Sequence, residues 1–410
     1  MNHPETKEKK WRIFGALPAN IVALGWVSLF TDVSSEMIYP LLPLFLTSVV
    51  GAGTTFVGLV EGIAEATASF LKLFSGWFSD RLGKRKTLVV AGYALSAMAR
   101  PLVAAATAGW HVLLVRFLDR VGKGIRTSPR DALLSDSVRR EETGKAFGFQ
   151  RAMDHHAGAV AGSLIAFFLL TFFTADYRLI FWAALVPGLI SVLILIFKVR
   201  ETKAAPPAVS VPPVRLTLQP FDRNFKSFLA VVILFTLSNS SDAFLILKAR
   251  EAGIPVSLIP LLWLFFHGVK SLSATPGGML SDILGRKKLI LTGWVLYSLV
   301  YFGFAMADTA LAIWVLFGIY GLFYGLTEGG ERAWVADLVK PHLRGTAYGL
   351  YNFSIGIGAL PASLALGFLW QKCGPQTAFG FGAVLALLAA VSLWFFVIEP
   401  PRKEMGNPPG

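Results

Sequence analysis

Charged residues are scarce in this sequence. Only 15% of its 410 residues are Asp, Glu, Lys or Arg, whereas about a quarter are charged in a typical soluble domain. The mean hydropathy is +0.60, and 54% of the residues are hydrophobic. Residues 180–197 and 378–398 contain no charge and match the roughly 20 residues with which a helix crosses a bilayer. The sequence therefore argues against a soluble domain and predicts a polytopic membrane protein.

Several kinds of chemistry are also missing. The single cysteine, Cys373, excludes an intrachain disulfide and a cysteine-based zinc site. The Lys123-Gly124 pair lacks the Gly-x-x-x-x-Gly-Lys-Ser/Thr spacing of a phosphate-binding loop, so no ATP-driven mechanism is indicated. No Ser, His or Asp stands in a nucleophile-elbow or metal-hydrolase motif. We therefore predict a protein that is not an enzyme and has no cofactor.

Hydrophobic spans predict an all-α membrane protein with twelve transmembrane helices. They lie near residues 18–48, 54–79, 87–108, 110–137, 146–174, 178–199, 226–250, 255–281, 289–309, 311–338, 345–371 and 375–398. With both termini in the cytoplasm, the only Lys and Arg in outer segments are Arg178, Lys248, Arg250 and Lys372. That bias follows the positive-inside rule and fixes the orientation. It also accounts for the net charge of +13 without a nucleic-acid partner.

Three segments of the first half recur in the same order in the second. They are GWFSDRLGKRK at 76–86 and GMLSDILGRKK at 278–288, LFTDVSSEM from Leu29 and LFTLSNSSDA from Leu234, and GKAFGF from Gly144 and GTAYGL from Gly345. Repeats at nearly one offset predict a tandem duplication into two pseudo-symmetric six-helix bundles. We expect a cytoplasmic leader at 1–17, bundles at 18–199 and 226–398, a flexible Pro-rich cytoplasmic linker at 200–225 and a cytoplasmic tail at 399–410.

The doubled loop resembles the signature loop of the major facilitator superfamily, and the resemblance covers essentially the whole chain. It implies two bundles that rock about a site at the membrane midplane. The candidate gating residues are Gly76, Asp80, Arg81, Gly83, Arg85 and Asp136 in the first half and Gly278, Asp282, Gly285, Arg286 and Asp337 in the second. An ion cluster there could latch one bundle to the other, or it could simply reflect topology. Ile283 stands where the first copy has Arg81, so the second latch is expected to be weaker.

The fourth predicted helix carries an unusual run of charges, DRVGKGIRTSPRDALLSD at 119–136. Its charged residues repeat at i, i+3, i+4 and i+7, the spacing of one helix face. Four basic residues facing lipid would cost about 10 kcal/mol, at about 2.5–3.5 kcal/mol each. The face therefore points into a polar interior, as structural ion pairs or as a transport pathway. Carboxylates for pairing are available on the first, second and fifth helices.

Candidate residues for proton coupling are Asp32, Glu36 and Arg116. Arg116 matches the arginine of the fourth-helix motif in proton-coupled family members, and Gly122 fits its glycine, although Asp119 and Arg120 depart from it. The resemblance implies that this arginine interacts with a carboxylate on the first helix, which gains and loses a proton in related proton-driven exporters. Desolvation raises the proton affinity of a carboxylate and a neighbouring Arg lowers it, so rocking can couple proton flow to shape. Static pairing is the alternative.

Candidate substrate-binding residues come from both halves. They are Glu61, Glu65, Arg120, Lys123, Asp154, His267, Tyr320, Tyr324 and Glu328. The cationic pair on the fourth helix suits a carboxylate or phosphate ligand. The two tyrosines and Glu328 follow at i, i+4 and i+8, a pattern that either lines a cavity or packs between helices.

These features favour proton-coupled export of a drug or small metabolite by a monomer in the plasma membrane, here a bacterial inner membrane. Gly158 and Gly162 fit the glycine spacing of the family's exporter motif, although Ser163 replaces its proline. Proton-coupled uptake of an organic or phosphorylated anion is the alternative. Transition-metal transport through Asp154, His155, His156 and His267 is disfavoured because adjacent helical residues diverge by about 100°. A non-transporting membrane receptor is disfavoured because buried charge usually marks a pathway.

Overall fold

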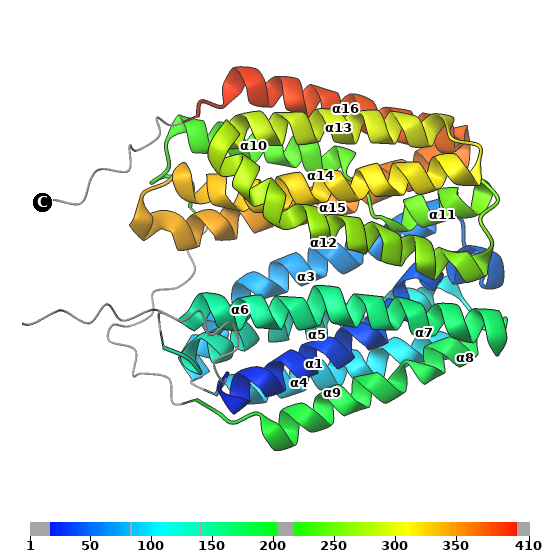
Figure 1. The fold of residues 1–410 in the computed structure, drawn as a ribbon. Helices are drawn as coiled ribbons and strands as arrows, with labels where there is room; N and C mark the ends of the chain where they lie inside the picture. Colours follow the sequence, from blue (N-terminus) through cyan, green and yellow to red (C-terminus); the bar gives the residue numbers. More distant parts are fainter. Residues whose placement is uncertain (1–16, 83, 140–141, 203–216, 400–410) are drawn as a thin grey trace, which may run out of the picture.

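The computed structural model describes residues 17–82, 84–139, 142–202 and 217–399, and within them the chain forms helices and no strand. The predicted leader and tail lie almost wholly outside the described residues, as do Gly83 and most of the linker. Two groups of roughly parallel helices lie side by side in Figure 1, the N-terminal half below and the C-terminal half above.

The N-terminal half contains α1 (Ala19–Glu36), η1 (Tyr39–Leu41), α2 (Leu42–Leu44), η2 (Phe45–Val49), α3 (Thr54–Leu82), α4 (Arg85–Ala99), η3 (Arg100–Ala105), α5 (Gly109–Asp136), α6 (Thr143–Arg151), η5 (Ala152–Gly158), α7 (Ala159–Phe172), α8 (Tyr177–Ala183) and α9 (Leu185–Lys198). The C-terminal half contains α10 (Arg223–Ser238), α11 (Ala243–Glu251), η6 (Val256–Leu258), α12 (Ile259–Leu284), α13 (Arg286–Met306), α14 (Ala310–Asp337), η7 (Pro341–Leu343), α15 (Arg344–Cys373) and α16 (Pro375–Phe396).

Each predicted span coincides with one helix or with a continuous run of shorter ones. The first is divided because Pro40 and Pro43 each lack an amide hydrogen, and the seventh is divided at 239–242. Ten of these helical segments in the described chain are long and apolar enough to cross a membrane. The other two, α3 and α5, have similar lengths but carry most of the intramembrane charge of the N-terminal half.

The duplication is visible in matching contacts at one end of each half. Arg85 pairs with Asp136, and Arg286 Nε lies 3.1 Å from Asp337 Oδ2. Both ion pairs lie within one half, so each fastens neighbouring helices of its own bundle. We call this end, on the left in Figure 1, the basic end.

A second pair of matching contacts secures the last helix of each half at the basic end. Lys86 donates its backbone amide to Glu201 Oε2 (2.9 Å) and its Nζ to the carbonyl of Ile196 (2.8 Å). In the other half, Lys287 donates its amide to Glu399 Oε1 (3.4 Å) and its Nζ to the carbonyl of Trp394 (2.8 Å). Equivalent hydrogen bonds in the two halves agree with their origin by duplication of one ancestral unit.

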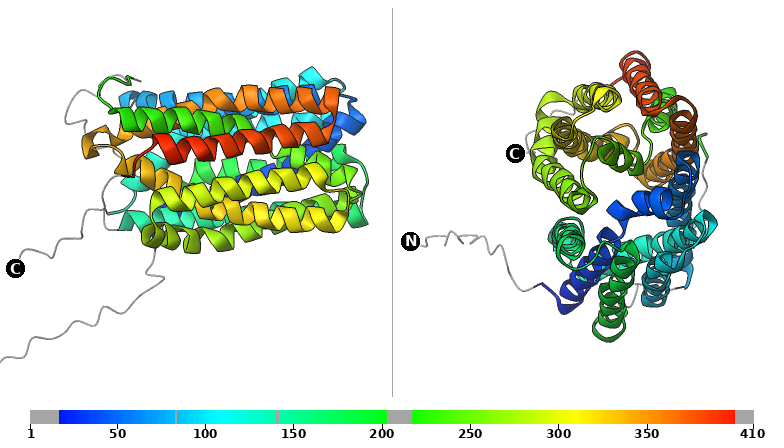
Figure 2. Two further views of the ribbon diagram at one scale, coloured as in Figure 1. Left: turned by 90° about the horizontal axis from the view of Figure 1, so that it is seen from above. Right: turned by 90° about the vertical axis from the view of Figure 1, so that its right-hand side faces the viewer.

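The halves pack together along α3 and α15, at glycines that permit close approach. A Cβ at Gly58 would lie 2.1 Å from the Ser363 carbonyl oxygen, and one at Gly367 would lie 2.5 Å from the Thr54 carbonyl oxygen. The Thr54 hydroxyl donates to the Gly367 carbonyl at 3.0 Å. These contacts lie away from the basic end. A second contact between the halves joins α7 and α12. The view along the helices in Figure 2 shows the N-terminal and C-terminal groups lying side by side.

Candidate transport site

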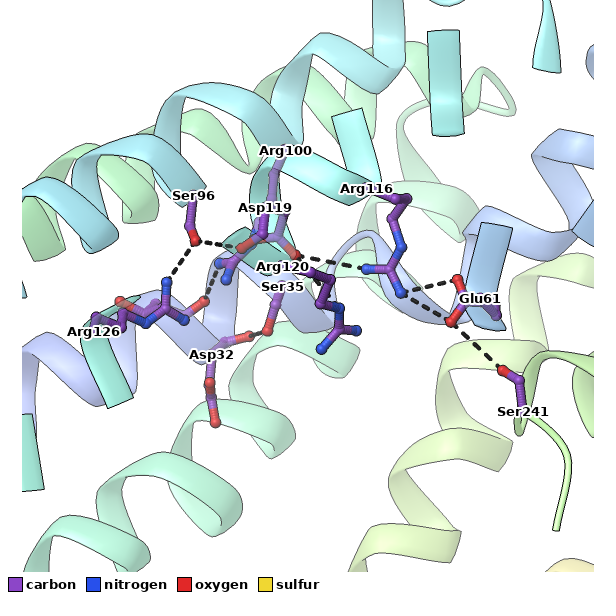
Figure 3. A network of polar contacts seen from close by, with 11 residues as sticks. Asp32, Ser35, Glu61, Ser96, Arg100, Arg116, Asp119, Arg120, Arg126 and Ser241 are labelled. Carbon is purple, nitrogen blue, oxygen red and sulfur yellow. Dashed lines mark hydrogen bonds and ion pairs between the residues drawn. The ribbon is translucent and has the colours of Figure 1, made fainter. Parts of the chain in front are cut away.

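Asp119 on α5 is the centre of a buried ion network (Figure 3). Its carboxylate accepts a hydrogen bond from Arg100 Nε at 2.7 Å and lies 3.7 Å from Arg116 Nη1 and 3.9 Å from Arg120 Nε. Asp119 is 4% exposed and Arg100 is 7% exposed. One carboxylate therefore holds three guanidinium groups in an interior where an isolated charge is strongly disfavoured.

Arg116 extends this network toward the other half. Its Nη2 donates to both carboxylate oxygens of Glu61 at 2.9 Å, and its guanidinium lies 5.6 Å from the ring centre of Tyr39. Glu61 Oε2 also accepts from the Ser241 hydroxyl of the C-terminal half at 3.5 Å. Arg116 thus pairs with Glu61 and Asp119, and Glu61 bridges the halves.

Asp32 and Glu36, on consecutive turns of α1, have different surroundings. The Asp32 carboxyl lies against that of Asp154. Glu36 Oε2 accepts a hydrogen bond from the indole Nε1 of Trp263 on α12 at 2.7 Å. The grouping of Asp32, Glu36 and Arg116 as one coupling unit stays a prediction.

Two charged side chains of α3 and α5 are accessible to water. Glu65 on α3 and Lys123 on α5 are both exposed. Neither makes a hydrogen bond or salt bridge with another side chain in the described part of the chain. Arg120, by contrast, is mostly buried, and its Nε has no hydrogen-bond acceptor there. Positive charge is therefore available beside the network for a further partner.

The C-terminal half contributes aromatic rings and a second carboxylate. The Tyr320 hydroxyl donates to Asp242 Oδ1 at 2.6 Å. Lys270 Nζ lies 4.3 Å from the ring centre of Tyr324 and 3.1 Å from Glu328 Oε2. Tyr320 and Tyr324 are thus brought together with charged groups. They also pack against neighbouring rings, as the packing interpretation expects, and the cavity-lining interpretation stays a prediction.

The remaining predicted residues are more dispersed. His267 packs against the rings of Trp263 and Phe266, with centroids 4.9 and 5.1 Å away. Arg81 is exposed, and a Cβ at Gly76 would meet Ser128 at 3.3 Å.

In the second signature loop, Arg286 Nη1 lies 2.7 Å from Asp282, and Gly278 has open space around it. Gly285 has φ +102°, a left-handed conformation that suits glycine between α12 and α13. The side chain of Asp80 is not among those described, so its gating role also stays a prediction.

Asp154 and three histidines are the candidate metal ligands of the sequence. Within the described residues, no group of three or more His, Cys, Asp or Glu side chains is arranged to hold a metal ion. The side chains of His155 and His156 lie outside that description.

A cavity of about 270 Å³ lies between the halves on the side away from the basic end. Its lining includes Thr47 and Tyr177 from the N-terminal half and Arg250, Glu251 and Trp370 from the C-terminal half. It is separate from the network around Asp119.

Sequence reasoning missed several members of the site. Arg100 stands inside the otherwise apolar predicted span 87–108, and Trp263 lies in an aromatic run. The fastening residues Glu201 and Glu399 follow the last spans as Val-Arg-Glu and Val-Ile-Glu, a similarity that could have revealed them.

Comparisons with known proteins agree with the resemblance. The sequence model of the Major Facilitator Superfamily matches residues 24–269 and 227–409. An uncharacterized MFS-type transporter of Methanocaldococcus jannaschii is 36% identical over 385 residues, covering 92% of this chain and 95% of that protein. The multidrug resistance protein MdtH of Proteus mirabilis is 25% identical over 329 residues, covering 78% and 80%.

Solved structures show the same fold at low sequence identity. The nucleoside transporter NupG superposes with a TM-score of 0.77 at 14% identity, covering 91% of this chain and 98% of that one. A bacterial homolog of the human lysosomal transporter Spinster, in an inward-facing and occupied conformation, gives a TM-score of 0.73 at 16% identity, covering 93% and 97%.

Proposed function

Because this chain belongs to the Major Facilitator Superfamily, a family of secondary transporters and not of enzymes, we propose that it exports a drug or small metabolite by alternating access driven by protons. The multidrug resistance relative favours export. In this proposal α3 and α5 also cross the membrane, giving twelve spans in two six-helix bundles. Both termini lie in the cytoplasm, and the protein acts as a monomer in the inner membrane.

The observation that carries this proposal is that intramembrane carboxylates tie the two halves together. Glu36 of the N-terminal half accepts from Trp263 of the C-terminal half, and Glu61 accepts from Ser241. A hydrogen bond to an ionised carboxylate is roughly twice as strong as one between neutral groups. Gain of a proton at Glu36 therefore weakens a contact that holds the halves in this arrangement.

The contacts between the two halves in this conformation indicate the order of steps in the transport cycle. The halves touch away from the basic end, while Glu328 and Arg332 on α14 are 44% and 51% exposed at their side chains. We propose that this conformation opens toward the basic end, which is the cytoplasmic side. Protonation of Glu36 then favours separation of α1 from α12, and the halves rock to expose the substrate on the other side.

We expect Glu36→Gln and Trp263→Phe to lower proton-driven transport at least about tenfold, equivalent to about 1.4 kcal/mol. Glu36→Gln removes the charge of the acceptor and its ability to gain a proton, while Trp263→Phe removes the indole N–H that donates to it. The measurement is transport in proteoliposomes with an imposed pH gradient, using ethidium, a purine nucleoside and an organic dianion as probes. Trp182→Phe, at an exposed tryptophan on α8, is the matched control.

Two outcomes would contradict the proposal. Transport that is equally fast with and without the pH gradient in the unsubstituted protein would remove proton coupling. A wild-type response in both Glu36→Gln and Trp263→Phe would remove this contact from the mechanism.

Proton-coupled uptake of an organic or phosphorylated anion is the second candidate, and the geometry of two cations favours it. Lys123 is exposed with no side-chain partner in the described structure, and the Arg120 ion pair with Asp119 is long, at 3.9 Å. A guanidinium and an ammonium with spare donors suit a carboxylate or a phosphate.

A thermal-shift screen with anionic, neutral and cationic compounds separates the two candidates. Ligands of the folded state raise its stability by mass action, so a hit reports binding without knowledge of transport direction. If the substrate is an anion, stabilising compounds are anionic and lose their effect in Arg120→Gln. For the exporter, we expect cationic or neutral hits that Arg120→Gln leaves unchanged.

A further inference from the structure

Two carboxyl groups from different helices meet inside the N-terminal half. Close packing of the fifth span on α1 at Gly158 brings Asp154 on η5 beside Asp32 on α1, and the two side-chain carboxyls make contact. Asp154 is 8% exposed, and its Oδ2 accepts from Gln150 Nε2 at 2.9 Å and lies 3.6 Å from Arg130 Nη1. Gln150 also donates to the Ser28 hydroxyl of α1 at 2.9 Å, which holds the two helices in register.

The sequence builds this meeting through small residues and a change of helix type. A Cβ at Gly158 would lie 2.6 Å from the Cβ of Asp32, and one at Gly162 would lie 2.8 Å from the Cβ of Glu36. Both glycines therefore let the fifth span lie directly on α1. Residues Ala152–Gly158 form a π-helical turn, a widened geometry that is frequent at functional sites. The turn presents Asp154 toward Asp32.

Two carboxylates in contact cannot both be ionised, because like charges at this separation repel strongly. The contact requires a proton between the two oxygen atoms. Among the side chains that the structure describes, the groups facing the pair include Arg130 and Lys123 from α5, Gln150 from α6 and Glu36 from α1.

We propose that Asp32 and Asp154 form a single proton-carrying site, in which one proton is shared between an α1 carboxyl and an η5 carboxyl. This inference rests on the proposed proton coupling and adds Asp154 to it as a coupling residue. When the proton leaves, one O–H bond breaks and the proton passes to water. The pair then carries two negative charges, which the two nearby cations of α5 compensate.

Arg130 is the group whose position responds to loss of the shared proton. Its Nη1 stands 3.6 Å from Asp154, beyond a direct hydrogen bond, while its Nη2 lies 2.8 Å from Asp131 Oδ1. Loss of the shared proton strengthens the attraction between Arg130 and Asp154. Release of a proton is thereby linked to a shift of α5 relative to the fifth span, independently of the bond between Glu36 and Trp263.

Infrared difference spectroscopy of the full-length protein in lipid, recorded over a pH series, tests the shared proton. We expect one carbonyl band of a protonated carboxylic acid that is lost in Asp32→Asn and equally lost in Asp154→Asn. The double variant should lose no more than either single variant. Asp308→Asn, at an exposed loop carboxylate, is the control and should retain the band.

A second measurement needs no substitution. Dicyclohexylcarbodiimide attacks protonated carboxyls in apolar surroundings, and its adducts are located by mass spectrometry. We expect adducts at Asp32 or Asp154 that decline as pH rises, and none at Asp119, which is held by arginines. Separate bands for Asp32 and Asp154, or no adduct at either residue, would overturn the shared site.

Failure of this inference and failure of the proposed function give different results. If Asp154→Asn retains both the band and gradient-driven transport, the pair is not the proton carrier, and proton coupling through other residues stands. If the band behaves as expected while transport in the unsubstituted protein ignores the pH gradient, the proposed coupling fails and the pair is a structural proton site.

Discussion

Replacing Asp119 with alanine is expected to destabilise the folded protein by about 3–5 kcal/mol, the cost of breaking a buried ion pair by removing one partner. The carboxylate of Asp119 lies 2.7 Å from Arg100 and within 4 Å of Arg116 and Arg120. Its removal leaves three mostly buried guanidinium groups with one fewer counter-charge. Glu61 still pairs with Arg116, but among the described residues Arg100 keeps the Thr31 carbonyl alone as an acceptor.

Thermal unfolding of the purified protein measures this loss. Asp131→Ala is the matched control, since Asp131 lies on the same helix and pairs with Arg130, but its side chain is 37% exposed. A pair at that exposure is worth no more than about 1 kcal/mol. The double variant Asp119→Asn with Arg100→Gln should recover part of the loss, because it removes a charge of each sign.

The result that would contradict the network is an equal, small effect of Asp119→Ala and Asp131→Ala. It would mean that water reaches the three arginines and that burial of the charges is incomplete.

The architecture could be predicted from the sequence because its signals are long and repeated. Apolar spans and the doubled loop gave the all-helical family fold, and the family match confirms that assignment. The repeat also relates two observed ion pairs, because Arg286 and Asp337 occupy positions equivalent to Arg85 and Asp136 and make the equivalent pair. The number of spans stays at the predicted twelve only if the charged helices α3 and α5 cross as well.

Pairing within the charged network was harder to predict, because several acids were equally available to each arginine. The helical period places Asp32, Glu36, Glu61 and Glu65 on inward faces, but it does not say how the helices are rotated against one another. Close packing at glycines decides this. Contacts of Gly158 and Gly162 set α1 against the fifth span, and that rotation brings Asp32 to Asp154.

Contacts between the halves could not be predicted from the sequence for a different reason. The Trp263 indole lies in an apolar run, where a tryptophan usually serves packing alone. Its bond to Glu36 depends on how two bundles meet in one conformation of the cycle. No local pattern encodes a contact that the molecule makes in only part of its cycle, which is the behaviour proposed for this bond.

Leucine at Gly58 is expected to shift the protein out of the conformation described here. A Cβ at this position would lie 2.1 Å from the Ser363 carbonyl oxygen of α15, a backbone atom that cannot move aside as a flexible side chain can. The contact between α3 and α15 must then open, while the packing inside each half is untouched. A penalty of about 3 kcal/mol changes a two-state equilibrium more than about 100-fold, so the alternative conformation becomes dominant.

Spin labels across the cavity away from the basic end report the change. Cys373 is exposed and is the only cysteine, so Cys373→Ser provides a background for Ser48→Cys and Val256→Cys, one in each half. The distance between the labels should lengthen in Gly58→Leu. Gly345→Leu on α15 is the control, because a Cβ there meets nothing within 4 Å, and it should leave the distance unchanged.

The same variant separates rocking of the halves from a rigid assembly. In the alternating-access proposal, Gly58→Leu remains folded, and accessibility of the Glu65 and Lys123 region from the basic end falls as the cavity end opens. If the folded variant instead shows an unchanged label distance, α3 and α15 have absorbed the side chain locally and their contact does not control the conformation. A distance that lengthens equally in Gly58→Leu and Gly345→Leu would indicate that any bulky residue on these helices loosens the protein. In that case the tight glycine contact would have no special part in the cycle.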